Sequence, residues 1–330
     1  HIDVRPYGRI RRPASTVRAT LGESRVEPDE PEVPVRGVTI DRHGGPEVLT
    51  LTELPEPVPA AGQVLIRTVA SSINPVDWKT RAGLLPTVPT PMVMGSDLAG
   101  IVVRGDGRYF APGDRVITTW SQLTTGTGTW VGLFAVPADL VARAPESVSL
   151  TEAATLPLAG LTAVQALDRL GLVRGETLLV LGAAGAVGGL AVQLAVDAGM
   201  AVDGLVSREA QVPAVLGLGA RSVTTRASGL HGYDAVLDTA GLPIPGAVRN
   251  GGRYVTIAQP TVPDQLAGRG VDAAVHYVRQ SGTDLTRLVA LVDAGRLRLR
   301  IAAHHPVREI VAASRAMEAG GLLGKVVLTF

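Results

Sequence analysis

Residues 178–196, "LLVLGAAGAVGGLAVQLAV", decide the fold of this chain. An apolar run ends at Gly182, a turn of small residues follows, and a second apolar run begins at about Ala186. A buried strand that leads through such a turn into a helix is typical of a dinucleotide-binding α/β domain. Small side chains let the backbone approach a pyrophosphate, and the free N–H groups at the start of the helix bind its charge.

The turn matches the dinucleotide fingerprint in part. Gly185 and Gly188 correspond to its second and third glycines, and Ala183 takes the place of the first. We therefore predict a cofactor-binding backbone made by Ala184, Gly185, Ala186, Val187 and Gly188. A purely structural turn is the alternative, because glycines also pack helices against sheets.

The end of the next apolar run bears on the choice of cofactor. An NAD-binding domain places an acidic residue there to bind the ribose hydroxyls, whereas Ser207 and Arg208 occupy that place in this chain. A hydroxyl followed by a guanidinium suits the 2′-phosphate of NADP. Asp203 falls about four residues earlier, in mid-strand, where it is interpreted as a hydrogen-bonded structural residue. The pattern predicts NADPH.

Strands and helices alternate around this unit, in the stretches "LAGLTAVQALDRLGL" (158–172), "AVDGLVS" (201–207), "YDAVLDTAG" (233–241) and "GRYVTIA" (252–258). The alternation predicts βαβ units and a doubly wound parallel sheet. We assign residues 158–298 to this Rossmann cofactor domain. Thr239 follows one of its strands, at the edge where dinucleotides bind, and is a candidate cofactor contact, as is Ile257 at the end of the next.

Short alternating runs between residues 35 and 157 predict a compact, barrel-like β domain. Residues 1–34 are rich in arginine and proline and then turn acidic, so we predict a disordered or loosely attached tail. A transit peptide is a minor alternative for this arginine-rich start, although its prolines oppose an amphipathic helix.

The composition excludes several kinds of site. The chain has 330 residues, a formal net charge of +1 and no cysteine, so disulfides and cysteine-based zinc sites are excluded. Near-neutral charge argues against nucleic-acid binding, and no apolar run is long enough to predict a membrane span. We expect a cytoplasmic protein. The only lysines are Lys79 and Lys325.

Several motifs in order resemble the medium-chain dehydrogenase/reductase superfamily, in its zinc-free quinone oxidoreductase and enoyl reductase branch. They are "SSINPVDWKTRAG" (71–83), "MGSDLAGIV" (94–102), "AATLPLAGLTAVQAL" (153–167), the glycine-rich turn and the terminal "GKVVL" (324–328). The resemblance implies a GroES-like β-barrel catalytic domain at 35–157, to which residues 299–330 return. It also implies a homodimer and a cleft between catalytic and cofactor domains.

The resemblance also implies a reaction without a metal. Zinc-dependent relatives carry Gly-His-Glu where this chain has Gly95-Ser96-Asp97, so a metal-ligating histidine is missing. Without a Lewis acid, alcohol oxidation is disfavoured, while hydride addition to a conjugated double bond stays accessible. We therefore expect an NADPH-dependent reductase of a quinone, an enone or an enoyl thioester. A non-catalytic NADPH-binding sensor or scaffold is the alternative.

Candidate catalytic residues lie in the "SSINPVDWKTRAG" loop, which by resemblance lines the nicotinamide pocket. Asn74 is expected to bind cofactor or substrate, with an ordinary Asn-Pro turn as the alternative. Lys79 is the candidate proton donor or enolate-stabilising group, against a solvated surface lysine. Asp77 either orients Lys79 or caps a short helix. Thr162 is assigned to the nicotinamide by resemblance alone.

Overall fold

The computed structural model describes residues 35–85 and 87–330, which belong to one compact unit. The tail predicted at residues 1–34 lies outside the described residues. None of the helices in the described ranges is long and apolar enough to cross a membrane.

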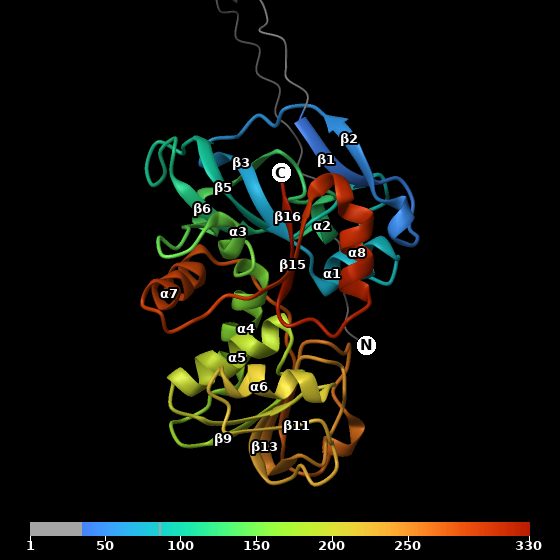
Figure 1. Ribbon diagram of the computed structural model, residues 1–330, viewed down its shortest axis with the longest axis vertical. Coiled ribbons are helices and arrows are strands. Elements are labelled where there is room, and N and C mark those ends of the chain that lie inside the picture. The colour runs from blue at the N-terminus through green and yellow to red at the C-terminus, as the bar shows by residue number, and fades with distance from the viewer. Residues whose placement is uncertain (1–34, 86) are drawn as a thin grey trace, which may run out of the picture. The chain divides into compact units, whose positions relative to one another are not determined.

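A parallel sheet of six strands forms the predicted cofactor domain, in the order β11-β10-β9-β12-β13-β14 (Figure 1). Its strands are β9 (Thr177–Leu181), β10 (Ala201–Leu205), β11 (Ser222–Thr224), β12 (Tyr233–Asp238), β13 (Val248–Thr256) and β14 (Asp272–Val275). All neighbouring strands pair in parallel, which confirms the predicted doubly wound sheet.

Both faces of this sheet are buried, because its side chains alternate between two apolar cores. Leu178 and Val180 of β9 join the core beneath helices α4 (Pro157–Leu170) and α5 (Ala186–Asp197). Leu179 and Leu181 of the same strand join the core on the opposite face. A continuous apolar run is therefore needed in β9, and residues 178–181 supply it.

The catalytic domain is built on two further sheets. One has seven strands, ordered β15-β16-β3-β5-β6-β8 with β7 paired to β3: β3 (Gln63–Ser72), β5 (Asp97–Arg104), β6 (Arg115–Thr119), β7 (Leu133–Pro137), β8 (Val141–Arg143), β15 (Ile301–Pro306) and β16 (Lys325–Thr329). The other has the order β2-β1-β4: β1 (Val35–Ile40), β2 (Thr50–Leu54) and β4 (Met92–Val93). This sheet arrangement fits the expected GroES-like domain.

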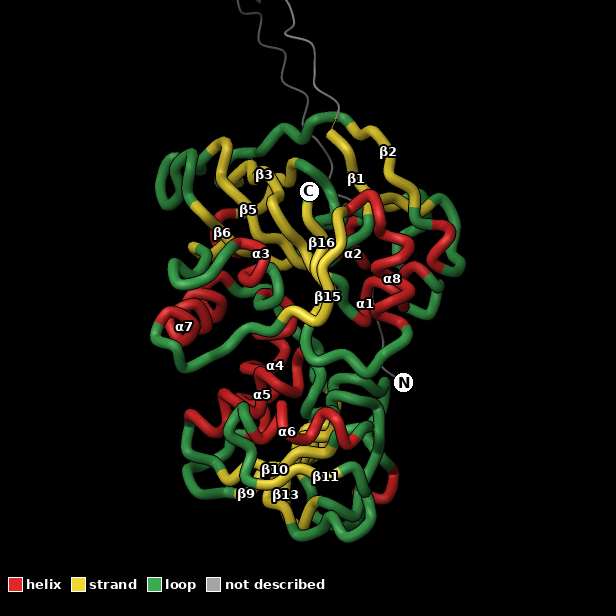
Figure 2. Tube along the Cα trace, in the orientation of Figure 1, coloured by secondary structure: helices red, strands yellow, loops and turns green. Residues whose placement is uncertain are grey.

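The chain returns to the first of these sheets at its end. Strand β16 pairs antiparallel with β3, so Val327 lies opposite Ser72, and β15 pairs in parallel with β16 (Figure 2). The pairing brings Lys325 next to the start of the chain's catalytic loop, although 251 residues separate it from Asn74.

The remaining helices are short and lie between strands. They are α1 (Pro75–Arg81), α2 (Gln122–Thr125), α3 (Leu150–Ala153), α6 (Val212–Leu216), α7 (Gly282–Asp293) and α8 (Ile310–Glu318). Pro213 stands in the first turn of α6, where its missing N–H group has no helical partner to lose.

Candidate active site

A cavity of about 650 Å³ lies along the carboxyl ends of the parallel strands. Such a volume suits a cofactor together with a small substrate. Ten of the predicted site residues line it: Asn74, Lys79, Ala184, Gly185, Ala186, Val187, Gly188, Ser207, Thr239 and Ile257. Among the described residues its only charged side chains are Lys79 and Lys325, so the lining is positive and suits an anionic ligand.

Backbone geometry builds the turn that sequence analysis singled out. Gly182 adopts a left-handed conformation (φ +80°), so it and not Ala183 makes the tight bend that requires glycine. A Cβ atom on Gly188 would lie 2.2 Å from the carbonyl oxygen of Gly182. Helix α5 therefore approaches the turn closely, with Gly185 as its N-cap, and its first N–H groups face the cavity.

The end of β10 differs in one respect from the prediction. Ser207 lines the cavity, and its backbone N–H and hydroxyl both donate to Gln211, which lines the cavity too and was not predicted. Arg208 is exposed and does not line the cavity; its guanidinium lies against Gly321 of the loop before β16. Sequence position alone could not distinguish the inward Ser207 from the outward Arg208.

Asp203 has the structural role expected of it. Arg221 donates to both carboxylate oxygens of Asp203, at 3.0 and 2.6 Å, and the hydroxyl of Tyr233 donates at 2.9 Å. Its charge is thereby held in mid-strand, away from the cavity lining.

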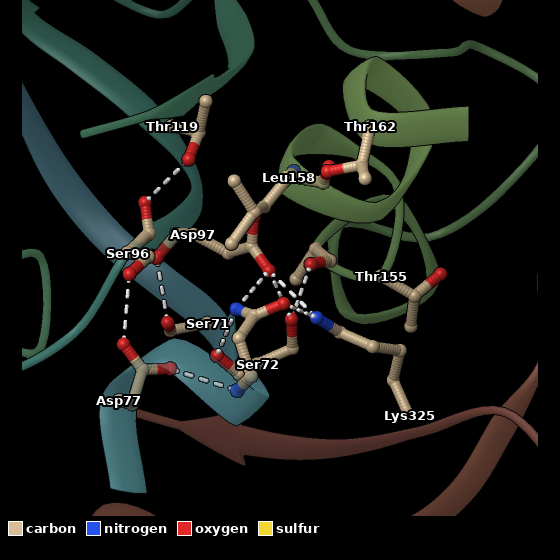
Figure 3. Close-up of polar contacts among 12 residues, drawn as sticks. Ser71, Ser72, Asp77, Ser96, Asp97, Thr119, Thr155, Leu158, Thr162 and Lys325 are labelled. Carbon is tan, nitrogen blue, oxygen red and sulfur yellow. Dashed lines mark hydrogen bonds and ion pairs between the residues drawn. The ribbon is translucent and has the colours of Figure 1, made fainter. Parts of the chain in front are cut away.

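Thr162 is a correction to the prediction. Its side chain is 8% exposed, and its hydroxyl donates to the carbonyl of Leu158 one turn earlier in α4, at 2.7 Å (Figure 3). It is absent from the residues that line the cavity. By contrast, Thr239 does line the cavity, and its hydroxyl donates to the carbonyl of Leu181, which joins the ends of β12 and β9.

Asp77 caps helix α1. This is a second correction, because sequence analysis also named Asp77 as a catalytic candidate. The backbone N–H of Asn74 donates to its carboxylate at 2.7 Å, which forms a capping box at the start of α1. Ser96 donates to the other oxygen at 2.7 Å (Figure 3). Gln122 donates to the same oxygen at 3.0 Å. Asp77 does not line the cavity.

Burial raises the pKa of Asp77 to about 6, although its hydrogen bonds with Ser96 and Asn74 act in the opposite direction. The nearby carboxylate of Asp97 raises this pKa further. Loss of solvation therefore outweighs the two hydrogen bonds and the positive charge of Lys325, which favour the ionised form.

Four side chains form what we call the buried polar cluster: Ser72, Asn74, Asp97 and Lys325. The ammonium group of Lys325 contacts Oδ2 of Asp97 at 2.9 Å and donates to Oδ1 of Asn74. The hydroxyl of Ser72 and the amide of Asn74 donate to the same Asp97 oxygen at 2.6 and 2.8 Å. In Figure 3, the side chains of Ser72 and Lys325 both point toward the same carboxylate oxygen of Asp97.

The cluster also connects three parts of the fold. Oδ1 of Asp97 accepts the backbone N–H of Leu158 at 2.7 Å, which satisfies a free donor at the start of α4.

Sequence analysis missed Lys325 as a site residue. Its presence as one of only two lysines, within the terminal "GKVVL" motif, was the available signal.

Lys79 is placed differently from Lys325. It is partly exposed and lines the cavity, with its ammonium nitrogen 6.0 Å from the centre of the Trp78 ring. No ion pair or hydrogen bond of its side chain occurs within the described part of the chain. Its charge is therefore available to a bound molecule.

Sequence analysis placed the position of a metal-ligating histidine at Ser96. Ser96 stands where a histidine would be needed, and its hydroxyl is committed to Asp77. In residues 35–85 and 87–330, no group of three histidine, cysteine or acidic side chains is arranged to hold a metal ion.

Comparison with known proteins agrees with this architecture. Residues 60–146 match the family model "Alcohol dehydrogenase GroES-like domain", and residues 215–328 match "Zinc-binding dehydrogenase". The mitochondrial NAD(P)H oxidoreductase RTN4IP1 of Mus musculus is 29% identical, over 90% of this chain and 93% of its own length. The 2-methylene-furan-3-one reductase of Solanum lycopersicum is 40% identical, over 40% of this chain and 36% of its own.

A solved structure extends the likeness to the whole fold. The quinone oxidoreductase from Coxiella burnetii has a TM-score of 0.84 and 27% identity, and the match covers 90% of this chain and 100% of that one. Taken with the sheets, the glycine-rich turn and the cavity, these matches show that the chain belongs to the medium-chain dehydrogenase/reductase superfamily, in its quinone oxidoreductase branch, and is an oxidoreductase.

Proposed function

We propose that this protein is a zinc-free, NADPH-dependent reductase that delivers hydride to a quinone or to an activated carbon–carbon double bond. The observation that carries the proposal is the cavity itself. One continuous lining joins the glycine-rich turn, the carboxyl ends of the parallel strands and the lysine of the catalytic loop. A dinucleotide and an acceptor can therefore occupy neighbouring parts of the same space.

The lining divides into regions that suit the parts of a dinucleotide. The start of helix α5, where Ala186 and Gly188 line the cavity, suits the pyrophosphate. Ser207 and Gln211 at the end of β10 suit the adenosine ribose. Thr239 and Ile257, at the ends of β12 and β13, lie where the nicotinamide is expected at the sheet's carboxyl edge.

Preference for NADPH is supported by where the charges are. Among the described residues no acidic side chain lines the cavity, and Asp203 is occupied by Arg221 and Tyr233. The ribose hydroxyls of NADH would therefore lack their usual carboxylate partner. Arg208 lies against Gly321, which does line the cavity, so a 2′-phosphate beside Ser207 would meet a nearby positive charge.

When bound, the reduced nicotinamide supplies a hydride to the β-carbon of the acceptor. Negative charge then develops on the conjugated carbonyl oxygen. Lys79 stabilises that charge from the cavity wall, and either Lys79 or water donates the proton that completes the reduction. Asn74 is held by Lys325 and Asp97, so its side chain has a fixed orientation at the cavity surface.

The relatives suggest the class of acceptor. A quinone oxidoreductase and a furanone reductase both act on conjugated carbonyl compounds, and Leu242, Ile257 and Ala258 offer an apolar wall for such a molecule. A homodimer remains an expectation from the family resemblance, and a cytoplasmic location remains a prediction from the sequence.

The proposal is tested by following reduced-nicotinamide absorbance with quinones, enones and enoyl thioesters, using NADPH and NADH in parallel. We expect turnover on a quinone or enone, faster with NADPH, that persists after dialysis against a chelator. Replacement Lys79→Ala should lower kcat while the Kd for NADPH stays the same. Tight NADPH binding without turnover on any acceptor would favour the non-catalytic alternative.

A further inference from the structure

Arg300 places a positive charge behind the glycine-rich turn. The function proposed above gives this arginine no role. It precedes strand β15, at the point where the chain returns from the cofactor domain to the catalytic domain. Its guanidinium reaches back to the turn: Nη1 donates to the carbonyl of Ala184 at 3.2 Å, and Nη2 donates to the carbonyl of Gly185 at 2.8 Å.

This arginine has no carboxylate partner within the described residues. It is partly buried, and loss of solvation lowers its pKa, but an arginine stays charged in a protein. The charge also lies at the N-terminus of α5, which is the positive end of the helix dipole. In the free protein this placement is electrostatically unfavourable, whereas an anion at the same helix end would compensate it.

The sequence makes room for this contact. A Cβ atom on Gly189 would lie 1.7 Å from Nη2 of Arg300, and the three nearest atoms all belong to that guanidinium. Gly189 lies within helix α5, where alanine is otherwise the better helix former. The glycine at this position is therefore explained by the arginine and not by the needs of the helix.

The contact also orients a donor toward the cavity. Across a trans peptide bond, the carbonyl of Gly185 and the N–H of Ala186 point in opposite directions. The carbonyl of Gly185 accepts both Nη2 of Arg300 at 2.8 Å and the backbone N–H of Gly189 at 2.9 Å, so the N–H of Ala186 points away from both donors. Ala186 lines the cavity, and this N–H has no hydrogen-bond partner in the described part of the chain.

We propose that Arg300 is a positioning residue for the cofactor: it aims the Ala186 N–H at the pyrophosphate and contributes a charge that the pyrophosphate compensates. The inference rests on the proposed function. It also assigns a role to the return of the chain, since the backbone carbonyl of Arg300 accepts the N–H of Lys325. The catalytic sheet is in this way joined to the cofactor turn.

The test compares Arg300→Met with Arg298→Met, an exposed neighbour on the same segment. Affinities are measured for NADPH and, by competition, for adenosine 2′-monophosphate, which has no pyrophosphate. We expect Arg300→Met to raise the Kd of NADPH roughly tenfold, because the hold on the Gly185 carbonyl and the charge that the pyrophosphate compensates are both removed. The Kd of the monophosphate should change less than twofold, and Arg298→Met should affect neither ligand.

A merely structural role would give a different pattern. It would weaken both ligands equally and lower the melting temperature of the ligand-free protein, and either equal weakening or an unchanged NADPH affinity would overturn the inference. Failure of wild-type protein to bind NADPH would instead contradict the proposed function, so the two failures are distinguishable.

A second pair of variants tests the contact itself. Gly189→Ala should weaken NADPH binding in the wild-type background, because its methyl group displaces the guanidinium. In an Arg300→Ala background the same substitution should leave the Kd unchanged, since the clash is gone. Equal effects in the two backgrounds would show that Gly189 serves something other than Arg300.

Discussion

The glycine-rich turn and two members of the buried polar cluster, Asn74 and Lys325, line one cavity, but the turn and the cluster are built in opposite ways. The turn is a contiguous stretch whose backbone atoms form the binding surface, and its side chains serve mainly by being small. The cluster consists of side chains from β3, the cap of α1, β5 and β16, brought together by sheet pairing. A backbone site depends on space, whereas a side-chain site depends on charge balance.

Lys325→Met should have the largest effect on stability, because it leaves Asp97 as an unpaired, fully buried carboxylate. Removing one member of a buried ion pair costs about 3–5 kcal/mol. Urea unfolding checks this value, with Lys79→Met as the control, since Lys79 has no such partner and should change stability by under about 0.5 kcal/mol.

A double variant sharpens the interpretation of the cluster. Adding Asp97→Asn to Lys325→Met removes the unpaired charge and should restore part of the lost stability. Equal destabilisation by the single and double variants would mean that packing, and not charge balance, holds this region together.

Asp77 gives the cluster's neighbourhood a pH dependence. Because burial raises its folded-state pKa from 3.8 to about 6, the folded protein binds the proton more tightly than the unfolded chain does. The contribution of Asp77 to the free energy of unfolding is therefore fully present below about pH 4. It is lost as the pH rises through 6, which lowers the free energy of unfolding by roughly 3 kcal/mol.

This sign is tested against Asp77→Asn, which has no titrating group at the position. The stability of wild type relative to that variant should fall between pH 4 and pH 7, measured by urea unfolding at several pH values. A relative stability that rises over this interval would contradict the burial argument, because it would mean that the hydrogen bonds lower the pKa of Asp77 more than burial raises it.

Gly188→Ala probes the backbone site instead. Its Cβ would lie 2.2 Å from the carbonyl of Gly182, so helix α5 must shift, at a cost of about 1–3 kcal/mol for overpacking. Gly185→Ala is the matched control, because its nearest neighbour lies at 3.3 Å and its backbone is extended. Thermal melting should separate the two, and similar melting temperatures would refute a tight helix–turn contact.

Arg208→Ala tests whether the Arg208 side chain adds selectivity for NADPH over NADH to the site formed by the backbone of the glycine-rich turn. The affinity for NADPH should fall roughly tenfold, as expected for a lost contact with a charged group, while the affinity for NADH stays constant. An unchanged ratio of the two affinities would mean that Arg208 serves only to pack on Gly321.

The same comparison explains what sequence could predict. The sequence predicted the glycine-rich turn, the parallel sheet, the β-rich domain and the helix that begins at Pro157. These features were predictable because the spacing of apolar residues and of nearby glycines encodes them. Lys325 was missed because its role arises from pairing β16 with β3, a long-range contact that no local pattern records. Thr162 was assigned to the nicotinamide by resemblance alone, and a resemblance does not reveal that its hydroxyl donates to the carbonyl of Leu158.

Isothermal titration of the wild-type protein with NADPH and NADH tests the central claim most directly. The account predicts one NADPH per chain, bound more tightly than NADH, because the described lining of the cavity contains no carboxylate and Arg208 lies against the lining residue Gly321. Tighter binding of NADH would contradict the cofactor assignment, and absence of binding by either would contradict the dinucleotide site itself.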